Sequence, residues 1–398
     1  MFKFFKNKKN SKNAKPVVDK AFTSSDLILA KNTSVDLSTE HGNVMVIGGP
    51  GSGKTRYFVR PNLLQAHYSY IVTDCGGECF KDTSVQMQDN GYEIVVLNLW
   101  EPEKSSKYNP IEYIYSKDDA EMLAKIILGD KTAWADRFVY DVSVNFLTAL
   151  LLLTKEHPSE SERNLGTTYL FCNNRKLTMK MLDRSSQQQL SKACVAYETA
   201  GIESLNLFKL VSNAVAPKLE MFCVGKYKNV FCGEDDLKLN RTNVKRILYI
   251  LIPPMGDFQT VSSMIYAQSI LAIASVSRMF ENMGRKFDHK TVMFMDDFSS
   301  TVYIPDFDKL LGLCKRHVCC VPILQSISQL KKLYSRYWEY IMDQIDMILY
   351  LGSMSMDTNE YIGKMTGMTI NEVQMLPKDH CIVASRSDGH NLDAKYEY

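Results

Sequence analysis

The sequence from Asn43 to Thr55 reads NVMVIGGPGSGKT, and this stretch decides the fold. A mostly apolar run ends at Ile47, as expected of a buried strand, and the residues after it match the pattern GxxxxGK[ST]. The matching residues are Gly48, Gly49, Pro50, Gly51, Ser52, Gly53, Lys54 and Thr55. Glycines let successive backbone N–H groups turn toward phosphate oxygens, and the N-terminus of the following helix points at the same anion. The stretch therefore predicts a strand, a phosphate-binding loop and a helix.

The loop predicts a site for ATP and Mg²⁺. Lys54 supplies a positive charge for the β and γ phosphates, and Thr55 offers its hydroxyl group to the metal. Such a loop needs a carboxylate on a neighbouring strand, and the run VMFMDDF, which ends at Phe298, supplies two. We expect Asp296 to hold the Mg²⁺ shell. In ATPases of this class, the acid at this position after the strand is a Glu that polarises the attacking water. Here the residue is Asp297.

The side chain of Asp297 is one methylene shorter than Glu, which bears directly on catalysis. A displacement of roughly 1 Å at a reacting water can cost on the order of a hundredfold in rate. Asp297 therefore predicts one of two outcomes. Either the protein hydrolyses ATP slowly, or Asp297 occupies this position without supporting catalysis.

Two further polar residues are candidates for the same site. Gln325 follows the apolar run that ends at Leu324, and the carboxyl end of a strand in a doubly wound sheet lies at the ligand crevice. We expect Gln325 to sense the γ-phosphate. Arg316 is either an arginine finger that reaches the nucleotide of a neighbouring subunit or a solvated residue at a helix end.

Short, continuous apolar runs recur along the chain and indicate a mainly parallel sheet that is buried on both faces. They are Val44–Ile47, Tyr70–Thr73, Ile94–Leu97, Ile247–Ile252, Val292–Met295, Val318–Leu324, Met347–Leu351 and Cys381–Ala384. The fold class is therefore α/β.

The strand signal disappears between about Tyr115 and Asn240, where the sequence reads as helical. The expected helices include Asp118–Leu128, Trp134–Thr154, Gln187–Ala200 and Ile202–Leu219. We expect an all-helical domain inserted into the α/β domain. The predicted order is a basic flexible tail (1–24), the first part of the nucleotide-binding domain (25–114), the inserted all-alpha domain (115–240) and the second part (241–398).

Composition excludes several classes of protein. Of the 398 residues, 45% are hydrophobic and 23% charged, as in soluble globular chains. Residues 1–20 hold seven Lys and one Asp, and the remainder carries a net charge of −4, so the body is no generally basic, DNA-coating protein. The tail is either solvated or rests on anionic lipid. The longest apolar stretch, Val142–Thr154, is too short to cross a bilayer, which predicts a cytoplasmic protein without a transmembrane segment.

Several segments together resemble one known family. They are NVMVIGGPGSGKTRYFVRPN (43–62), SYIVTDCGGE (69–78), YNP (108–110), DDF (296–298) and ILQSISQL (323–330). The chain resembles the type IV secretion system coupling proteins, which are TraG/TraD-like conjugative DNA-transfer ATPases, particularly those of Gram-positive mobile elements. The resemblance runs from about residue 25 to the end.

The resemblance implies a RecA-like P-loop motor domain with an inserted all-alpha domain, assembled as a homo-hexamer with each nucleotide between neighbours. It also implies partners, namely single-stranded DNA with a bound relaxase and the components of the secretion channel. By position, Lys54 and Thr55 match the phosphate lysine and the magnesium hydroxyl, Asp296 and Asp297 match the acidic pair, and Gln325 matches the sensor glutamine. Arg316 falls where many members have a basic residue.

The chain also departs from the family pattern. Members usually read Asp-Pro-Lys-Gly-Glu where this chain has Asp74-Cys75-Gly76-Gly77-Glu78, and Asp-Glu-Phe-Ala-Asn where it has DDFSS (296–300). We expect the N-terminal membrane helices of the family to be absent from this protein. We therefore expect any location at the inner face of the cell membrane to depend on partners or on the basic tail.

The leading hypothesis is an ATP-driven coupling protein for conjugative DNA transfer. One alternative is a nucleotide-binding adaptor of the same apparatus with weakened catalysis, which Asp297 and Gly76 favour. Another is a soluble hexameric DNA pump, which the helical insertion disfavours. A metabolic kinase is less favoured still, because the sequence has no lid-like segment rich in Arg.

Overall fold

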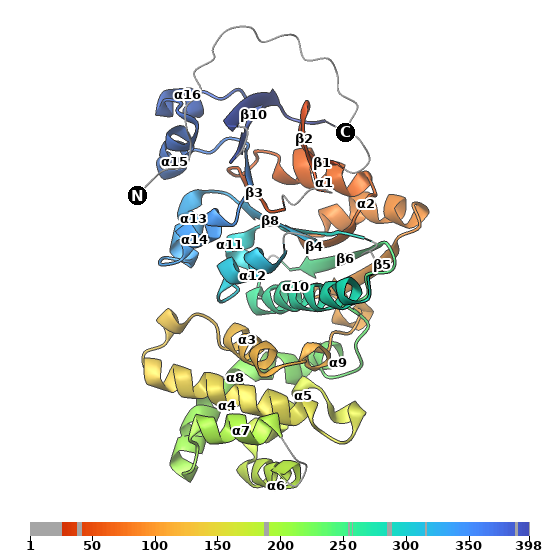
Figure 1. The fold of residues 1–398 in the computed structure, drawn as a ribbon, viewed down its shortest axis with the longest axis vertical. Coiled ribbons are helices and arrows are strands. Elements are labelled where there is room, and N and C mark those ends of the chain that lie inside the picture. Colours follow the sequence, from red (N-terminus) through yellow and green to blue (C-terminus); the bar gives the residue numbers. More distant parts are fainter. Residues whose placement is uncertain are drawn as a thin grey trace.

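A computed structural model describes residues 26–37, 42–186, 191–253, 255–256, 258–284, 289–314, 317–386 and 389–397. A nine-stranded sheet in the order β11-β10-β9-β3-β8-β7-β4-β6-β5 forms the centre of the fold (Figure 1). The strands are β1 (Asp26–Ala30), β2 (Thr33–Asp36), β3 (Val44–Ile47), β4 (Ser69–Cys75), β5 (Glu93–Asn98), β6 (Arg246–Ile252), β7 (Thr291–Met295), β8 (Val318–Leu324), β9 (Met347–Tyr350), β10 (His380–Ser385) and β11 (Gly389–Ala394).

The sheet is parallel from β9 to β5, and β10 pairs in antiparallel fashion with β9 on one side and with β11 on the other. Strands β3 to β10 coincide with the eight apolar runs in the sequence, so the mainly parallel α/β sheet is confirmed. Strand β3 is buried along its whole length, and its alternate residues face two different cores: Val44 and Val46 one, Met45 and Ile47 the other. This two-sided burial explains why the runs are continuous rather than alternating.

Strands β1, β2 and β11 lie outside the predicted set. Strands β1 and β2 form a separate antiparallel hairpin, which contacts the β11 edge of the sheet. Asp393 makes this contact: its carboxylate accepts hydrogen bonds from the backbone N–H of Asn32 (2.9 Å) and from the hydroxyl of Thr33 (2.6 Å). The sequence signal was weak because β2 (TSVD) and β11 (GHNLDA) are mostly polar.

Helices cover both faces of the sheet. They are α1 (Arg60–Leu64), α2 (Glu78–Asp89), α10 (Gln259–Asn282), α11 (Phe298–Thr301), α12 (Phe307–Cys314), α13 (Ile327–Leu333), α14 (Trp338–Asp343), α15 (Met356–Thr366) and α16 (Ile370–Gln374). Between β5 and β6 the described chain forms helices joined by loops and contains no strand. Its helices are α3 (Lys117–Leu128), α4 (Arg137–Lys155), α5 (Leu165–Asn173), α6 (Arg175–Ser186), α7 (Lys192–Ala200), α8 (Leu205–Cys223) and α9 (Lys228–Phe231). We call these seven helices the helical block; the domain boundaries at 115 and 240 stay a prediction.

Helix α10 lies between the sheet and the helical block (Figure 1). Apolar residues of one sheet face, of α10 and of the block belong to a single continuous core. Buried polar contacts cross the same region: Tyr108 donates its hydroxyl to Gln268 Oε1 on α10, and Gln268 Nε2 donates to the carbonyl of Pro110 at 2.9 Å. The block is therefore packed on the sheet domain through α10.

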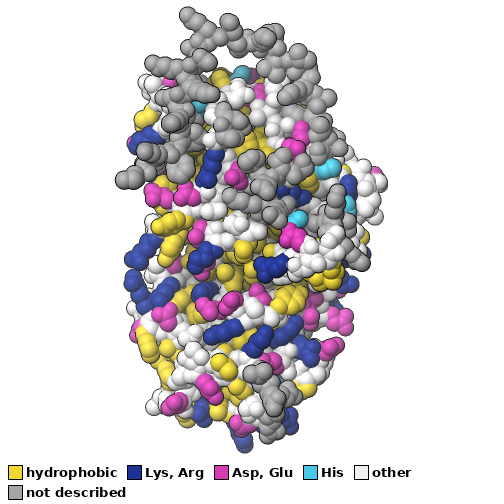
Figure 2. Space-filling view, viewed as in Figure 1, with side chains coloured by type: hydrophobic (Ala, Val, Ile, Leu, Met, Phe, Trp, Pro, Cys, Tyr) yellow, Lys and Arg dark blue, Asp and Glu magenta, His cyan; other side chains and the backbone are white. Residues whose placement is uncertain are grey.

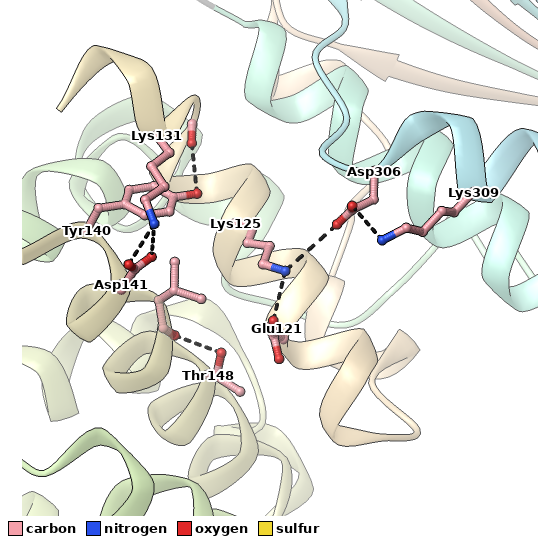
Figure 3. Close-up of polar contacts among 10 residues, drawn as sticks. Glu121, Lys125, Lys131, Tyr140, Asp141, Thr148, Asp306 and Lys309 are labelled. Carbon is pink, nitrogen blue, oxygen red and sulfur yellow. Dashed lines mark hydrogen bonds and ion pairs between the residues drawn. The ribbon is translucent and has the colours of Figure 1, made fainter. Parts of the chain in front are cut away.

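An ion pair at the surface makes a second link (Figure 3). Lys125 on α3 lies 2.8 Å from Glu121 and 3.9 Å from Asp306, which precedes α12. Lys309 lies 2.8 Å from the same Asp306. Because these side chains are partly exposed, the contribution to stability is small, and apolar packing dominates the association.

Two helices, α4 and α10, are long and apolar enough to cross a membrane by length and composition, among the residues that the structure describes. In each, 72% of the most apolar window is buried inside the protein. Packing in the core accounts for their composition. The basic tail predicted for residues 1–24 lies outside the described residues.

Candidate functional site

The candidate site lies at the carboxyl ends of the parallel strands, where the crevice of an open α/β sheet forms. The loop after β3 is anchored to the strands on either side. The backbone N–H of Gly48 donates to the carbonyl of Leu324 at 2.9 Å, and that of Gly49 donates to the carbonyl of Gly352 at 2.8 Å. The loop therefore starts from a fixed position between β8 and β9.

Glycine is required inside the loop for steric reasons. A Cβ atom on Gly48 would lie 2.4 Å from Ser52 Oγ, and one on Gly53 would lie 2.2 Å from the ring of Tyr57. Gly53 also has a φ of +86°, a conformation that L side chains rarely adopt. The buried hydroxyl of Ser52 has no hydrogen-bond partner within the described chain. A cradle without Cβ atoms and with an unsatisfied hydroxyl fits a phosphate group.

Lys54 and Thr55 bring the loop to the acidic pair. The ammonium group of Lys54 donates to the carbonyls of Gly48 (2.9 Å) and Gly49 (3.3 Å), so it lies over the loop. Thr55 begins a π-helical turn (Thr55–Val59) and donates its hydroxyl to Asp296 Oδ2 at 3.0 Å. The structure thus places a hydroxyl and a carboxylate together beside the phosphate cradle, and this donor set suits Mg²⁺.

Asp296 is partly buried, and the pKa of its carboxyl group is raised. Burial and, to a smaller extent, the negative charge of Asp297 raise the pKa of Asp296 from 3.8 to about 6. Hydrogen bonds from Thr55 and from the backbone N–H of Asp297, together with the charge of Lys54, oppose this rise. A divalent cation would relieve the cost of ionising this carboxyl, so the residues fit a magnesium site.

Asp297 follows at the sharp turn out of β7. Its φ of +48° lies in the left-handed region, and its backbone N–H donates to Asp296 Oδ1 at 3.0 Å. Gln325 Nε2 donates to Asp297 Oδ1 at 3.3 Å. The two residues predicted to act on the γ-phosphate end of the nucleotide therefore contact each other directly.

The expectation that the acidic pair follows a strand next to the phosphate-loop strand was wrong in one respect. Strand β8 lies between β3 and β7, and Gln325 follows this intervening strand. The backbone of Gln325 is held on both sides: its N–H donates to Gln329 Oε1 at 2.9 Å, and its carbonyl accepts from Ser353 Oγ at 3.3 Å. The topology places Gln325 between the phosphate loop and the acidic pair.

The remaining predicted positions make none of the contacts described above or lie outside the described chain, although the charges of Asp296 and Asp297 act on Cys75 and raise the pKa of its thiol. Arg316, the candidate arginine finger, lies outside the described residues. Asp74, in the altered motif after β4, accepts a hydrogen bond from the backbone N–H of Phe80 at 2.8 Å, and burial raises its pKa. Cys75 and Cys79 are free thiols, and no group of three or more His, Cys, Asp or Glu residues that could hold a metal occurs in the described parts of the chain.

Two residues that contact the site were not predicted from the sequence. Thr73 donates its hydroxyl to the carbonyl of Asp296 at 3.1 Å, and Lys395 donates its ammonium group to the carbonyl of Ser52 at 3.2 Å. The threonine immediately precedes the conspicuous Asp74 in an apolar run, which is a weak signal. No local signal marks Lys395, because only the return of the chain after β11 brings it to the loop.

Comparisons with known proteins show which proteins this chain is similar to. The chain is similar to the conjugative coupling protein TrwBΔN70 in an unbound form, with 14% identity, a TM-score of 0.66, and coverage of 96% of this chain and 90% of that chain. It is similar to the plasmid coupling protein TrwB in complex with ADP and Mg²⁺, with 12% identity, a TM-score of 0.68, and coverage of 96% and 91%. VirB4 of Thermoanaerobacter pseudethanolicus is similar at 12% identity and a TM-score of 0.56, with coverage of 94% of this chain and 96% of that chain.

These likenesses show the fold, which is that of a P-loop NTPase. A comparison with curated proteins finds no matching relative. The family model for type IV secretory system conjugative DNA transfer matches residues 2–393, which is nearly the whole chain. The chain therefore belongs to the family of type IV secretion proteins for conjugative DNA transfer, the coupling proteins.

Proposed function

We propose that this protein is an ATP-driven coupling protein that recruits single-stranded DNA with its bound relaxase and translocates it to the channel of a type IV secretion system. Family membership supports the general role. The observation that carries the enzymatic part is the contact between Thr55 Oγ1 and Asp296 Oδ2 at 3.0 Å, beside a loop that accepts only glycine at its closest approaches. The related protein TrwB has been solved with ADP and Mg²⁺.

This proposal assigns a task to each site residue. Lys54 neutralises the β and γ phosphates of ATP, and Thr55 and Asp296 hold the Mg²⁺ shell. Bound Mg²⁺ supplies positive charge that stabilises the transferring phosphoryl group. Asp297 orients the attacking water, and Gln325 holds the Asp297 carboxylate and senses the γ-phosphate.

Assembly and substrate docking belong to the same proposal. Six copies form a ring with nucleotides between neighbours, and Arg316 reaches across to the adjacent site. The helical block, corresponding to residues 115–240, receives the substrate. Lys and Arg side chains on the visible face of the block are interleaved with Asp and Glu (Figure 2), so DNA contacts are expected to be local. The Lys-rich tail contacts anionic lipid at the inner face of the membrane.

A second candidate function is a nucleotide-gated adaptor with little or no hydrolysis. The observation that favours it is the geometry of Asp297, whose short carboxylate is held by Gln325 at 3.3 Å. A third candidate, a soluble hexameric DNA pump, would act without a relaxase or channel partner.

ATP turnover with and without single-stranded DNA, at several stated salt concentrations, tests the proposal. We expect DNA-stimulated turnover in the wild type and its loss in Lys54→Ala. A wild type without turnover, together with activity in Asp297→Glu, would replace the motor by the adaptor. DNA stimulation with no binding to a relaxase–DNA complex would favour the pump.

A further inference from the structure

The chain after β11 returns to the back of the phosphate loop and places a lysine there. Lys395 is 9% exposed, and its ammonium group donates to the carbonyl of Ser52 at 3.2 Å. The acceptor is a main-chain carbonyl of the loop rather than a carboxylate. A lysine side chain is seldom this deeply buried, and the hydrogen bond of its ammonium group is made to the loop itself.

The position of Lys395 is held from several sides. Its backbone N–H donates to the carbonyl of Asp379 at 2.7 Å, and Asp393 ties the preceding strand to the β1–β2 hairpin. The Lys395 ammonium group lies 5.6 Å from the centre of the Tyr57 ring. The same ring lies directly behind Gly53, within 2.2 Å of where a Cβ would be. Lys395, the ring of Tyr57 and Gly53 thus lie next to one another behind the phosphate loop.

The geometry of a peptide unit connects this contact to phosphate binding. In a planar trans peptide the C=O and the following N–H point in opposite directions. A carbonyl of Ser52 that is held outward by Lys395 therefore turns the N–H of Gly53 to the other side, toward the phosphate cradle.

We propose that Lys395 is a positioning residue of the phosphate loop: its hydrogen bond to the Ser52 carbonyl holds the Ser52–Gly53 peptide in the orientation that binds phosphate. The effect on affinity rests on the proposed function, since it requires that the loop binds ATP with Mg²⁺. The effect on the orientation of the loop does not depend on the proposed function.

The experiment compares Lys395→Met and Lys395→Arg with the wild type. Lys364→Met is the matched control, because it removes the same charge from an exposed lysine on α15 that pairs with Glu360. Binding of a fluorescent ATP analogue with Mg²⁺ is measured by titration. Amide hydrogen exchange of residues 48–55 is followed in protein without nucleotide.

We expect Lys395→Met to weaken nucleotide binding about tenfold, the size of a lost charge-assisted hydrogen bond, and to speed exchange in the loop. Lys395→Arg should restore affinity to within about threefold, because a guanidinium group can donate to the same carbonyl. Lys364→Met should match the wild type in both measurements.

Unchanged affinity and unchanged loop exchange in Lys395→Met would overturn the proposal. Exchange that rises equally across the whole sheet would also overturn it, since Lys395 would then support the fold in general. If Lys395→Met does not fold, Lys395→Gln takes its place with the same criteria. A wild type that binds no nucleotide contradicts the proposed function instead, and loop exchange still decides the role of Lys395.

Discussion

Gln325 and Asp297 form a direct hydrogen bond, with Gln325 Nε2 3.3 Å from Asp297 Oδ1. They come from the ends of the neighbouring strands β8 and β7. The backbone of Gln325 is held on both sides, and its side-chain amide donates to the shorter carboxylate and so directs it. A glutamate at position 297 would extend farther, and this hydrogen bond gives the aspartate a defined orientation in its place.

We predict that Gln325→Ala lowers the kcat of ATP hydrolysis by about ten- to a hundredfold, because Asp297 loses the group that orients it. The dissociation constant for ATP should change by less than about threefold, since Gln325 has no part in the loop itself. Steady-state kinetics and nucleotide titration measure the two effects, with the exposed Gln374→Ala as control. A loss of binding equal to the loss of turnover would contradict the assigned role.

The raised pKa of Asp296 predicts a dependence on pH. A carboxyl whose pKa is higher in the folded protein stabilises the fold fully below its ordinary pKa of 3.8 and loses that contribution as the pH rises through about 6. Asp296→Asn carries no such charge. In buffer with a metal chelator, the melting temperature of Asp296→Asn relative to the wild type should therefore rise between about pH 4 and about pH 6 and change little above about pH 7.

The same substitution should remove the metal site. We expect wild-type affinity for ATP with Mg²⁺ to fall below about pH 6, where Asp296 takes up its proton, and Asp296→Asn to bind weakly at every pH. Exposed Asp183→Asn serves as the control for both measurements. A pH-independent difference in melting temperature would show that Asp296 ionises normally in the folded protein.

Gly53→Ala should abolish nucleotide binding. The added methyl group meets Tyr57 and the positive φ is unfavourable, so the loop must change shape. Gly201→Ala is a sharp control, because Gly201 also has a positive φ, +64°, but has open space around it and lies in the helical block. Both variants should lose about 1–2 kcal/mol of unfolding free energy, and only Gly53→Ala should lose binding by titration. Equal binding by the two would rule out a strict requirement for glycine.

Tyr108→Phe should lower the unfolding free energy by about 1–3 kcal/mol, because Gln268 Oε1 on α10 loses its buried donor. Denaturant unfolding measures the change. Tyr337→Phe removes a hydroxyl from a side chain that is 56% exposed and should have little effect. If Tyr108→Phe lowered the unfolding free energy no more than Tyr337→Phe does, a water molecule would be replacing the lost Tyr108 hydroxyl as the donor to Gln268.

The parallel sheet and the phosphate site could be read from the sequence because both leave local marks. Strands β3 to β10 are apolar along their length, and the requirement for glycine at Gly48 and Gly53 produces a recognisable pattern. The order of the strands in the sheet has no local sequence signal, so only the structure shows that β8 lies between β3 and β7. Lys395 is the clearest residue that was missed, since its role depends on a contact between residues 343 positions apart.

Helix α10 has a consequence for how this chain can be altered. It contributes to the core on both sides, toward the sheet and toward the helical block, although its sequence lies outside the block. Removing residues 115–240 would leave an apolar surface on α10 in water, and a block grafted from a relative would meet a helix shaped for another partner. An exchange of the helical block between coupling proteins would therefore have to transplant α10 with the block.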